Sequence, residues 1–117
     1  MLEYKIIESK IQKIKIDYTL IKEEQVSIEA KATAKMKIPK DKESKRVLFE
    51  ITFEAEEKTN NNRFIEATGM VIFEFYGTPD YQNIPKEEYP NIAMKNIVNK
   101  IDNILCAMGF DNFKFSE

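Results

Sequence analysis

The stretch VSIEAKATAKMKI, residues 26–38, alternates apolar and polar side chains without interruption. Every even position is apolar and every odd position is polar. Successive side chains of a β-strand point to opposite faces, whereas a helix would scatter these apolar residues around its axis. The stretch therefore predicts a β-strand with one buried face.

Three further stretches extend this pattern to a sheet. Residues 9–20 are expected to form a first strand that is irregular at its start, because the apolar positions change parity before Lys13 and a bulge produces such a change. Residues 46–57 and 63–76 predict the third and fourth strands. Polar turns separate the strands, as in antiparallel hairpins. The pattern leaves open whether residues 2–8 join the sheet.

A helical pattern follows a linker that contains Pro85 and Pro90. From Asn91 to Met108, apolar residues recur every three or four positions, which is typical of an amphipathic helix. Asn91 is expected to cap its N-terminus and Gly109 to end it. We therefore predict an α+β fold, a four-stranded antiparallel meander sheet followed by one long C-terminal amphipathic helix.

The composition narrows the possible functions. The 117 residues suit a single domain, residues 1–117. The formal net charge of −2 argues against nucleic-acid binding. The chain has no histidine, three glycines and one cysteine, so the commonest general base, a phosphate-binding loop and an intrachain disulfide are all missing. We expect no enzymatic activity, no metal and no cofactor.

Other sequence features indicate an ordinary globular chain. No stretch is apolar over the roughly 18 residues that a membrane helix needs, and the first residues lack the apolar core of a signal peptide. We expect a cytoplasmic protein with no membrane insertion. Cys106 is expected to be a small core residue, and Gly69 to mark a bulge or a close-packing site.

The apolar sheet face is expected to be larger than one helix can cover. Four strands of this length make a face about 44 Å long and about 19 Å wide. The helix would be about 27 Å long and about 10 Å across, which is about a third of that face. Soluble monomers rarely expose so large an apolar patch. We expect a second copy, a partner, a ligand or a client chain to cover the remainder.

Apolar residues outside the regular alternation are the candidate binding residues. Leu48, Met70 and Ile72 fall on the second face of the sheet and are assigned to an oligomer interface, either a dimer or a tetramer. The candidates near the fourth strand, the linker and the helix ends are assigned to client binding: Tyr76, Tyr81, Ile84, Tyr89, Phe110 and Phe113. Local packing is the alternative for both groups.

Several segments resemble the SecB-type chaperone family. ESKIQKIKI, residues 8–16, is similar to that family's opening strand. FIEATGMVIF, residues 64–73, is similar to its fourth strand, where a glycine precedes an apolar stretch. Pro90 before the helix and Met108-Gly109-Phe110 after it are similar to the family's helix and its Gly-Phe ending.

The resemblance implies an ATP-independent holdase that binds unfolded polypeptides in apolar grooves and assembles as a dimer of dimers. Subunits and clients would then cover the surplus apolar face. The chain departs from the family in residues 77–90, which leave little room for the family's first helix and crossover loop. In addition, only the third strand is acidic, so transfer of clients to an export ATPase is not expected.

Three functions remain open from the sequence. The first is a general holdase for unfolded polypeptides. The second is an oligomeric adaptor or a chaperone dedicated to one partner, for example in a toxin–antitoxin pair, without general holdase activity. The third is an enzyme or a small-ligand carrier with a cavity between sheet and helix; the missing histidine argues against the enzyme and leaves a lipid-like ligand.

Overall fold

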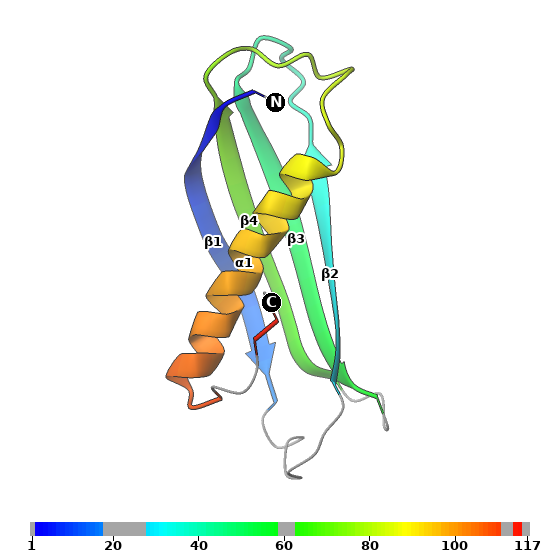
Figure 1. Ribbon diagram of the computed structural model, residues 1–117, viewed down its shortest axis with the longest axis vertical. Helices are drawn as coiled ribbons and strands as arrows, with labels where there is room; N and C mark the ends of the chain where they lie inside the picture. The colour runs from blue at the N-terminus through cyan, green and yellow to red at the C-terminus, as the bar shows by residue number, and fades with distance from the viewer. Residues whose placement is uncertain (1, 18–27, 59–62, 111–113, 116–117) are drawn as a thin grey trace.

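Four strands form an antiparallel sheet, and a long helix lies across one of its faces (Figure 1). The computed structural model describes residues 2–17, 28–58, 63–110 and 114–115. The elements are β1 (Tyr4–Ile16), β2 (Ile28–Lys37), β3 (Arg46–Glu57), β4 (Arg63–Phe75) and α1 (Glu88–Ala107). The predicted fold class, an α+β fold with four antiparallel strands and a C-terminal helix, is confirmed.

The strand order in the sheet is β1-β4-β3-β2. β2, β3 and β4 follow one another as a meander, whereas β1 pairs with β4 and not with its neighbour in the sequence, so the predicted meander is wrong for the first strand. In a Greek key, three strands are joined by hairpins and a long connection brings a fourth strand beside the outermost of them. β1, which lies beside β4, is that fourth strand here. β1 and β2 are consequently the two edge strands of the sheet. Asp17, which follows β1, and Ile28, which begins β2, lie at opposite edges.

β1 contains the irregularity that the sequence predicted. Its pairing with β4 shifts between Ile6 and Glu8 and again between Ile11 and Lys13, so each shift inserts one extra residue. These bulges keep the apolar residues on the inner face despite the change of parity. The strand begins at Tyr4, so most of residues 2–8 join the sheet. Residues 18–20, which the sequence assigned to this strand, lie outside the described residues.

The core lies between α1 and the inner faces of the two central strands. The apolar inward residues of β3 and β4 are at most 4% exposed: Val47, Phe49, Ile51, Phe53, Ala55, Ile65, Ala67, Val71, Phe73 and Phe75. Phe64 joins them because the pairing of β3 and β4 shifts between Ala55 and Glu56. Phe64 is 1% exposed and meets Phe110 edge to face.

An aromatic cluster closes the core at the end where β1 begins, at the top of Figure 1. Tyr4 stacks on Phe73 with ring centroids 4.4 Å apart. Tyr89 of α1 packs edge to face on Phe75, with centroids 5.1 Å apart. The Tyr89 hydroxyl donates a hydrogen bond to the Leu2 carbonyl, 3.3 Å away. The first residues of the chain, the end of β4 and the start of α1 are thereby joined.

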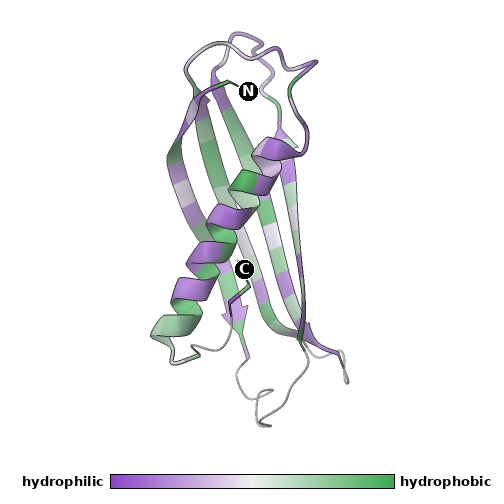
Figure 2. Cartoon of the chain, in the orientation of Figure 1, coloured by the Kyte–Doolittle hydropathy of each residue, from purple (hydrophilic) through white to green (hydrophobic). Residues whose placement is uncertain are grey.

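α1 crosses the sheet diagonally, from β2 and β3 at the top of Figure 1 to beyond β1, and contacts all four strands. Its sheet-facing side is buried and its other side carries hydrophilic bands (Figure 2). The helix begins at Glu88, three residues before the predicted cap Asn91, and Glu87 precedes it without a side-chain cap. Pro90 fits the first turn because the backbone N–H of that turn has no partner within the helix.

The C-terminal end of α1 is as predicted. Gly109 has φ +94°, a conformation that glycine adopts without steric cost. The Gly109 and Phe110 amides donate to the carbonyls of Cys106 and Leu105, at 3.0 and 2.8 Å. These two bonds make a Schellman motif, which ends the helix. Cys106 in the last turn is exposed, so the prediction that it is a core residue is wrong.

Gly69 is a close-packing site. A Cβ placed on Gly69 would lie 2.9 Å from the Cδ1 atom of Ile97 and 3.0 Å from the Lys10 carbonyl oxygen. The missing side chain is what lets α1 approach β4 here. The bulge at Ile11/Lys13 falls next to this point of the β1–β4 ladder.

The expectation that most of the apolar face needs an outside cover is wrong for β3 and β4. The diagonal path carries α1 over every strand, and residues from the linker and from both ends of the chain add cover, including Tyr4, Ile84, Phe110 and Phe115. The Phe115 amide donates to Asp102 Oδ1 of α1 at 2.8 Å, which holds this residue over Phe53. Incomplete cover is confined to the edge strands, where Ala32 and Ala34 of β2 are half-buried.

Candidate functional site

The outer face of the sheet, which points away from α1, carries charges in matched rows. Most of its lysines lie on the edge strands and most of its glutamates on the central strands, although Glu8 and Glu29 are on the edges. The cross-strand partners are Lys5↔Glu74, Lys15↔Glu66, Lys31↔Glu54 and Lys35↔Glu50. Opposite charges in directly opposed positions favour one pairing register over its alternatives. Thr33 and Thr52 share a hydrogen bond of 2.9 Å in the middle of this surface.

Two arginines form the closest ion pairs recorded on this face. Arg63 lies 2.6 Å from Glu66, 3.4 Å from Glu56 and 3.6 Å from Glu54. Its hydrogen bond lowers the pKa of the Glu66 carboxyl, and Lys15 and Lys13 lower that pKa further. The Arg46 guanidinium, 2.9 Å from Glu74, lowers the pKa of the Glu74 carboxyl in the same way.

The predicted oligomer residues form a small apolar cluster on this outer face. Leu48 of β3 pairs directly with Ile72 of β4, and Met70 lies two residues further along β4. All three side chains are half-buried within the monomer. The structure therefore brings these three residues together, and their role in an oligomer stays a prediction.

Exposed apolar side chains gather at the end of the sheet where β1 begins. We call this end, made of residues 2–7, 38–45 and 76–87, the upper end. Five of the six large apolar residues that are exposed in the described chain belong to it: Leu2, Ile6, Ile7, Ile38 and Tyr76. Tyr76 is 63% exposed, the highest value among them. The sixth, Met108, follows α1 at the opposite end.

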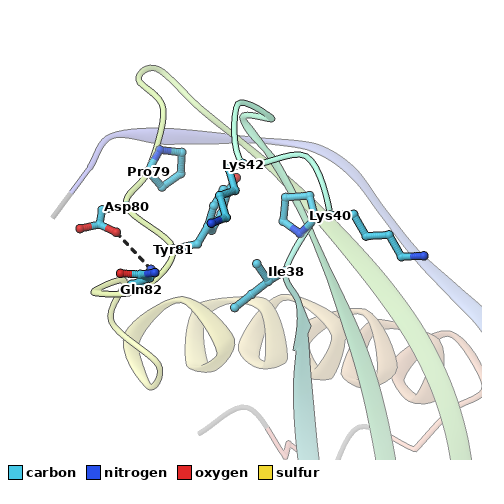
Figure 3. A pocket seen from close by; sticks show the side chains of 8 residues that line it. Ile38, Lys40, Lys42, Pro79, Asp80, Tyr81 and Gln82 are labelled. Atoms are coloured by element: carbon cyan, nitrogen blue, oxygen red, sulfur yellow. Dashed lines mark hydrogen bonds between the residues drawn. The ribbon is translucent and has the colours of Figure 1, made fainter.

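A pocket of about 350 Å³ opens at the upper end between the loop after β2 and the loop after β4 (Figure 3). We call it the upper pocket. Its lining residues are Ile38, Pro39, Lys40, Lys42, Pro79, Asp80, Tyr81 and Gln82. This volume lies within the range of about 300–1,000 Å³ that is typical of ligand pockets.

Tyr81 joins the two loops that form the upper pocket. Its hydroxyl donates a hydrogen bond to the Ser44 carbonyl of the facing loop. Burial raises the pKa of Tyr81, and the nearby Asp41 carboxylate raises it further, so the hydroxyl keeps its proton and remains a donor at neutral pH. The tyrosine ring is therefore a fixed wall of the pocket.

The predicted client-binding residues fall into different surroundings. Tyr76 is exposed, and Tyr81 is half-buried in the wall of the upper pocket. Phe110 is half-buried against Phe64 below α1. Phe113 lies outside the described residues. Tyr76 and Tyr81 are thus brought to the same end of the molecule, and Phe110 is not.

Ile84 and Tyr89 are core residues in this structure. Ile84 is 7% exposed and Tyr89 is 1% exposed, so neither can contact a client in this arrangement. The reason is the early start of α1 at Glu88, which directs Tyr89 into the aromatic cluster. In the sequence both residues lie in the proline-marked linker, where nothing indicates that they are covered.

Sequence reasoning missed several residues of the upper end. Ile38 was assigned to the buried face of the second strand, but β2 ends at Lys37 and Ile38 is 48% exposed. Pro39, directly after it, was the available signal, because proline interrupts a strand ladder. Leu2, Ile6 and Ile7 were not selected, because the sequence left open whether residues 2–8 join the sheet.

The described residues were compared with the side-chain groups that hold metal ions and with the helices that cross membranes. No group of three or more His, Cys, Asp or Glu side chains is placed to hold a metal ion there. Within the same residues, no helix has the length and apolar character that crossing a membrane would require.

No protein-family model matches the sequence, and no curated protein matches it either. The fold, however, is similar to that of a solved structure, the SecB-like chaperone Rv1957 of Mycobacterium tuberculosis in complex with a ChAD peptide from the HigA1 antitoxin. The TM-score is 0.57, and the match covers 91% of this chain and 80% of the other. The fold is SecB-like. With 6% sequence identity, the likeness concerns the fold alone.

Proposed function

We propose that this SecB-like chain is an ATP-independent chaperone that holds non-native polypeptides. The observation that carries the proposal is that five exposed apolar side chains lie at the upper end, where a pocket with a fixed tyrosine wall also opens; one of the five, Ile38, lines that pocket. Apolar burial is non-directional, so such a surface accepts many sequences. Extended chains bind such sites through separate apolar anchors.

A chaperone dedicated to one partner is the second candidate. The solved neighbour of similar fold holds a peptide from an antitoxin, which favours a protein partner over a lipid-like ligand. Under either candidate the chain needs no catalytic residue and no cofactor. Self-association through Leu48, Met70 and Ile72, and a cytoplasmic location, stay predictions.

The test is suppression of aggregation. A denatured, unrelated protein is diluted into buffer with and without this chain, and light scattering is followed in the absence of ATP. We expect stoichiometric suppression, and we expect the double variant Ile38→Ser/Tyr76→Ser to lose most of it. Met108→Ser is the matched control, because it removes an exposed apolar side chain at the opposite end.

One outcome would decide against the general holdase, and another would decide against the upper end as its client site. Unchanged scattering at several-fold excess of the native chain would leave only the dedicated partner, to be captured from the native host. Equal loss of suppression in Met108→Ser and in the upper-end variant would show that the upper end is not the client site. Circular dichroism of each variant confirms that its fold is retained.

A further inference from the structure

The start of β1 is a short unit of the sheet. Residues 4–6 pair with residues 73–75 of β4, and the ladder then shifts between Ile6 and Glu8. Such a shift bends the strand and interrupts its pairing. β1 is also an edge strand, so only β4 pairs with it in the described part of the chain. Residues 2–6, which we call the leading segment, are therefore attached to the sheet from one side and separated from the rest of β1 by a bulge.

Tyr4 is the most exposed ring of the aromatic cluster. It is half-buried, whereas Phe73, Phe75 and Tyr89 are at most 1% exposed. Besides its stack on Phe73, its ring meets Tyr89 edge to face with centroids 5.8 Å apart, and Phe75 at 6.3 Å. The side chain of Tyr4 therefore covers buried rings, and its departure would uncover an aromatic surface beside the backbone of residues 73–75.

Hydrogen bonds beyond the ladder also attach the leading segment. The Tyr76 amide donates to the Glu3 carbonyl at 3.1 Å. The Tyr89 hydroxyl donates to the Leu2 carbonyl at 3.3 Å, which is longer than the range of about 2.5–3.0 Å usual for a hydroxyl donor. The second bond is therefore a weak one.

The other side chains of the leading segment bury little apolar surface. Apart from Tyr4, every side chain of residues 2–6 is exposed. Lys5 forms an ion pair with Glu74 at 3.5 Å, but solvent reaches both side chains, and such pairs stabilise little. Parts of a fold with few buried apolar contacts open at the lowest free energy. We therefore expect the leading segment to leave the sheet more readily than β3 or β4.

We propose that the leading segment is the internal occupant of a client-binding site, and that an extended client segment with an aromatic side chain displaces it. The client would pair with residues 73–75 of β4 and place its ring where Tyr4 lies. It would replace the start of β1 and would not add to the outer edge of the sheet. This inference rests on the proposed function and names the class of segment that the site takes.

The exchange restores what it removes. A client ring in the place of Tyr4 recovers the stack on Phe73, and the client backbone recovers the ladder bonds to β4. No buried backbone group is then left unpaired. Tyr76 lies beside the same positions and is exposed, so a longer client covers it as well. This additional burial favours the client over the leading segment.

A disulfide that locks the leading segment tests the displacement. Lys5→Cys/Glu74→Cys, in a chain whose one native cysteine is changed by Cys106→Ser, joins directly paired residues of β1 and β4. The Cα atoms of such pairs lie about 4.5–5.5 Å apart, which suits a disulfide. Lys15→Cys/Glu66→Cys is the matched control, because it joins another lysine–glutamate pair near the far end of the same ladder. Free-thiol titration shows that each disulfide has formed.

The probe is a fluorescent peptide that copies residues 2–8, LEYKIIE, and fluorescence polarisation gives its Kd. The oxidised form of Lys5→Cys/Glu74→Cys should bind it about tenfold or more weakly than the reduced form, as the loss of a central anchor site causes. Oxidation of the control should leave the Kd unchanged. The same peptide with serine in place of its tyrosine should bind weakly to every form.

Tyr4→Ser provides a test that needs no disulfide. This variant weakens the internal occupant, so the open form becomes more populated and the apparent Kd of the peptide should fall by about threefold to tenfold. Tyr4→Phe keeps the ring and should bind the peptide as the native chain does. Circular dichroism confirms that each variant retains the fold.

Equal Kd values for the oxidised and reduced forms of the locked chain would overturn the inference, as would equal binding of the tyrosine and serine peptides. Aggregation suppression separates it from the proposed function. If the oxidised locked chain suppresses aggregation as well as its reduced form does, the inference fails and the chaperone stands. If no form suppresses aggregation or binds the peptide, both fail.

Discussion

The two faces of the sheet are built from alternate residues of the same strands, yet they contribute to the fold in different ways. On β4 the inner residues, such as Phe73, are fully buried against α1, whereas their outer neighbours, such as Ile72 and Glu74, remain partly accessible. The inner face holds the molecule together by excluding water from apolar surface. The outer face has four directly opposed lysine–glutamate pairs, which favour this register. Neighbouring residues are therefore expected to respond very differently to the same substitution.

The largest contrast is expected between Phe73→Ala and Ile72→Ala. Phe73 is 0% exposed and touches Tyr4 and Phe49, so its truncation leaves a cavity and should cost about 3–5 kcal/mol of the free energy of unfolding. Ile72 is only half-buried on the outer face, and its truncation should cost about 1 kcal/mol. Urea unfolding followed by circular dichroism gives both values. Similar values for the two variants would contradict the assignment of the core to one face.

A second contrast concerns two glycines. Gly69→Ala on the inner face places a methyl group 2.9 Å from Ile97 and 3.0 Å from a backbone oxygen, and this overpacking should cost about 1–3 kcal/mol. Gly77→Ala meets only Leu2 Cδ2 at 3.7 Å, an ordinary contact, and should be close to neutral. The difference in urea midpoint measures this contrast. A neutral Gly69→Ala would mean that α1 shifts on β4 at no cost.

A substitution in the outer apolar cluster should change the mass of the oligomer more than the stability of the monomer. Met70→Lys puts a charge beside Leu48 and Ile72, and should change the stability of the monomer by no more than about 1 kcal/mol because the position is partly exposed. If this cluster is the oligomer interface, the variant should sediment as a monomer in analytical ultracentrifugation, whereas Thr33→Lys, elsewhere on the same face, should retain the native mass. An unchanged mass for Met70→Lys would remove the cluster from the interface.

The smallest expected effect is electrostatic and depends on pH. Arg63 lowers the pKa of the Glu66 carboxyl below its ordinary value of 4.5, so this pair stabilises the fold at neutral pH. That contribution is lost as the pH falls below 4.5 and the carboxylate is protonated. Arg63→Gln should therefore lower Tm at pH 7 and have little effect near pH 3. A Tm difference that does not vary with pH would show that Arg63 acts through packing.

Regular alternation in the sequence was enough to predict most of the sheet. The alternation in residues 46–57 matches β3, and the parity change in β1 was correctly interpreted as a bulge. The pairing of β1 with β4 was not predictable in this way. Alternation defines which face of a strand is buried, but it carries no information about which strand lies beside it.

Only part of the candidate site could be predicted, because the sequence pattern also carries no information about which loops meet in the fold. Tyr76 and Tyr81 reach the upper end, but Ile84 and Tyr89 are core residues, and Tyr89 is buried because α1 begins earlier than its cap signal indicated. Ile38 shows the opposite error, because a periodic apolar residue at the end of a strand was expected to be covered. Periodicity reports burial within an element, whereas binding sites form where elements end and loops from distant parts of the chain meet.

The position of the lysines on the outer face has a consequence for aggregation. An open sheet with two free edges is a template onto which further strands can add, as in amyloid. Both edge strands here are rich in lysine on their outer face, Lys10, Lys13 and Lys15 on β1 and Lys31, Lys35 and Lys37 on β2, and β1 is interrupted by two bulges. Edge-to-edge growth would bring like charges together and meet a distorted ladder. The edges of this sheet are therefore poor templates for the addition of further strands, including strands of other β-prone polypeptides.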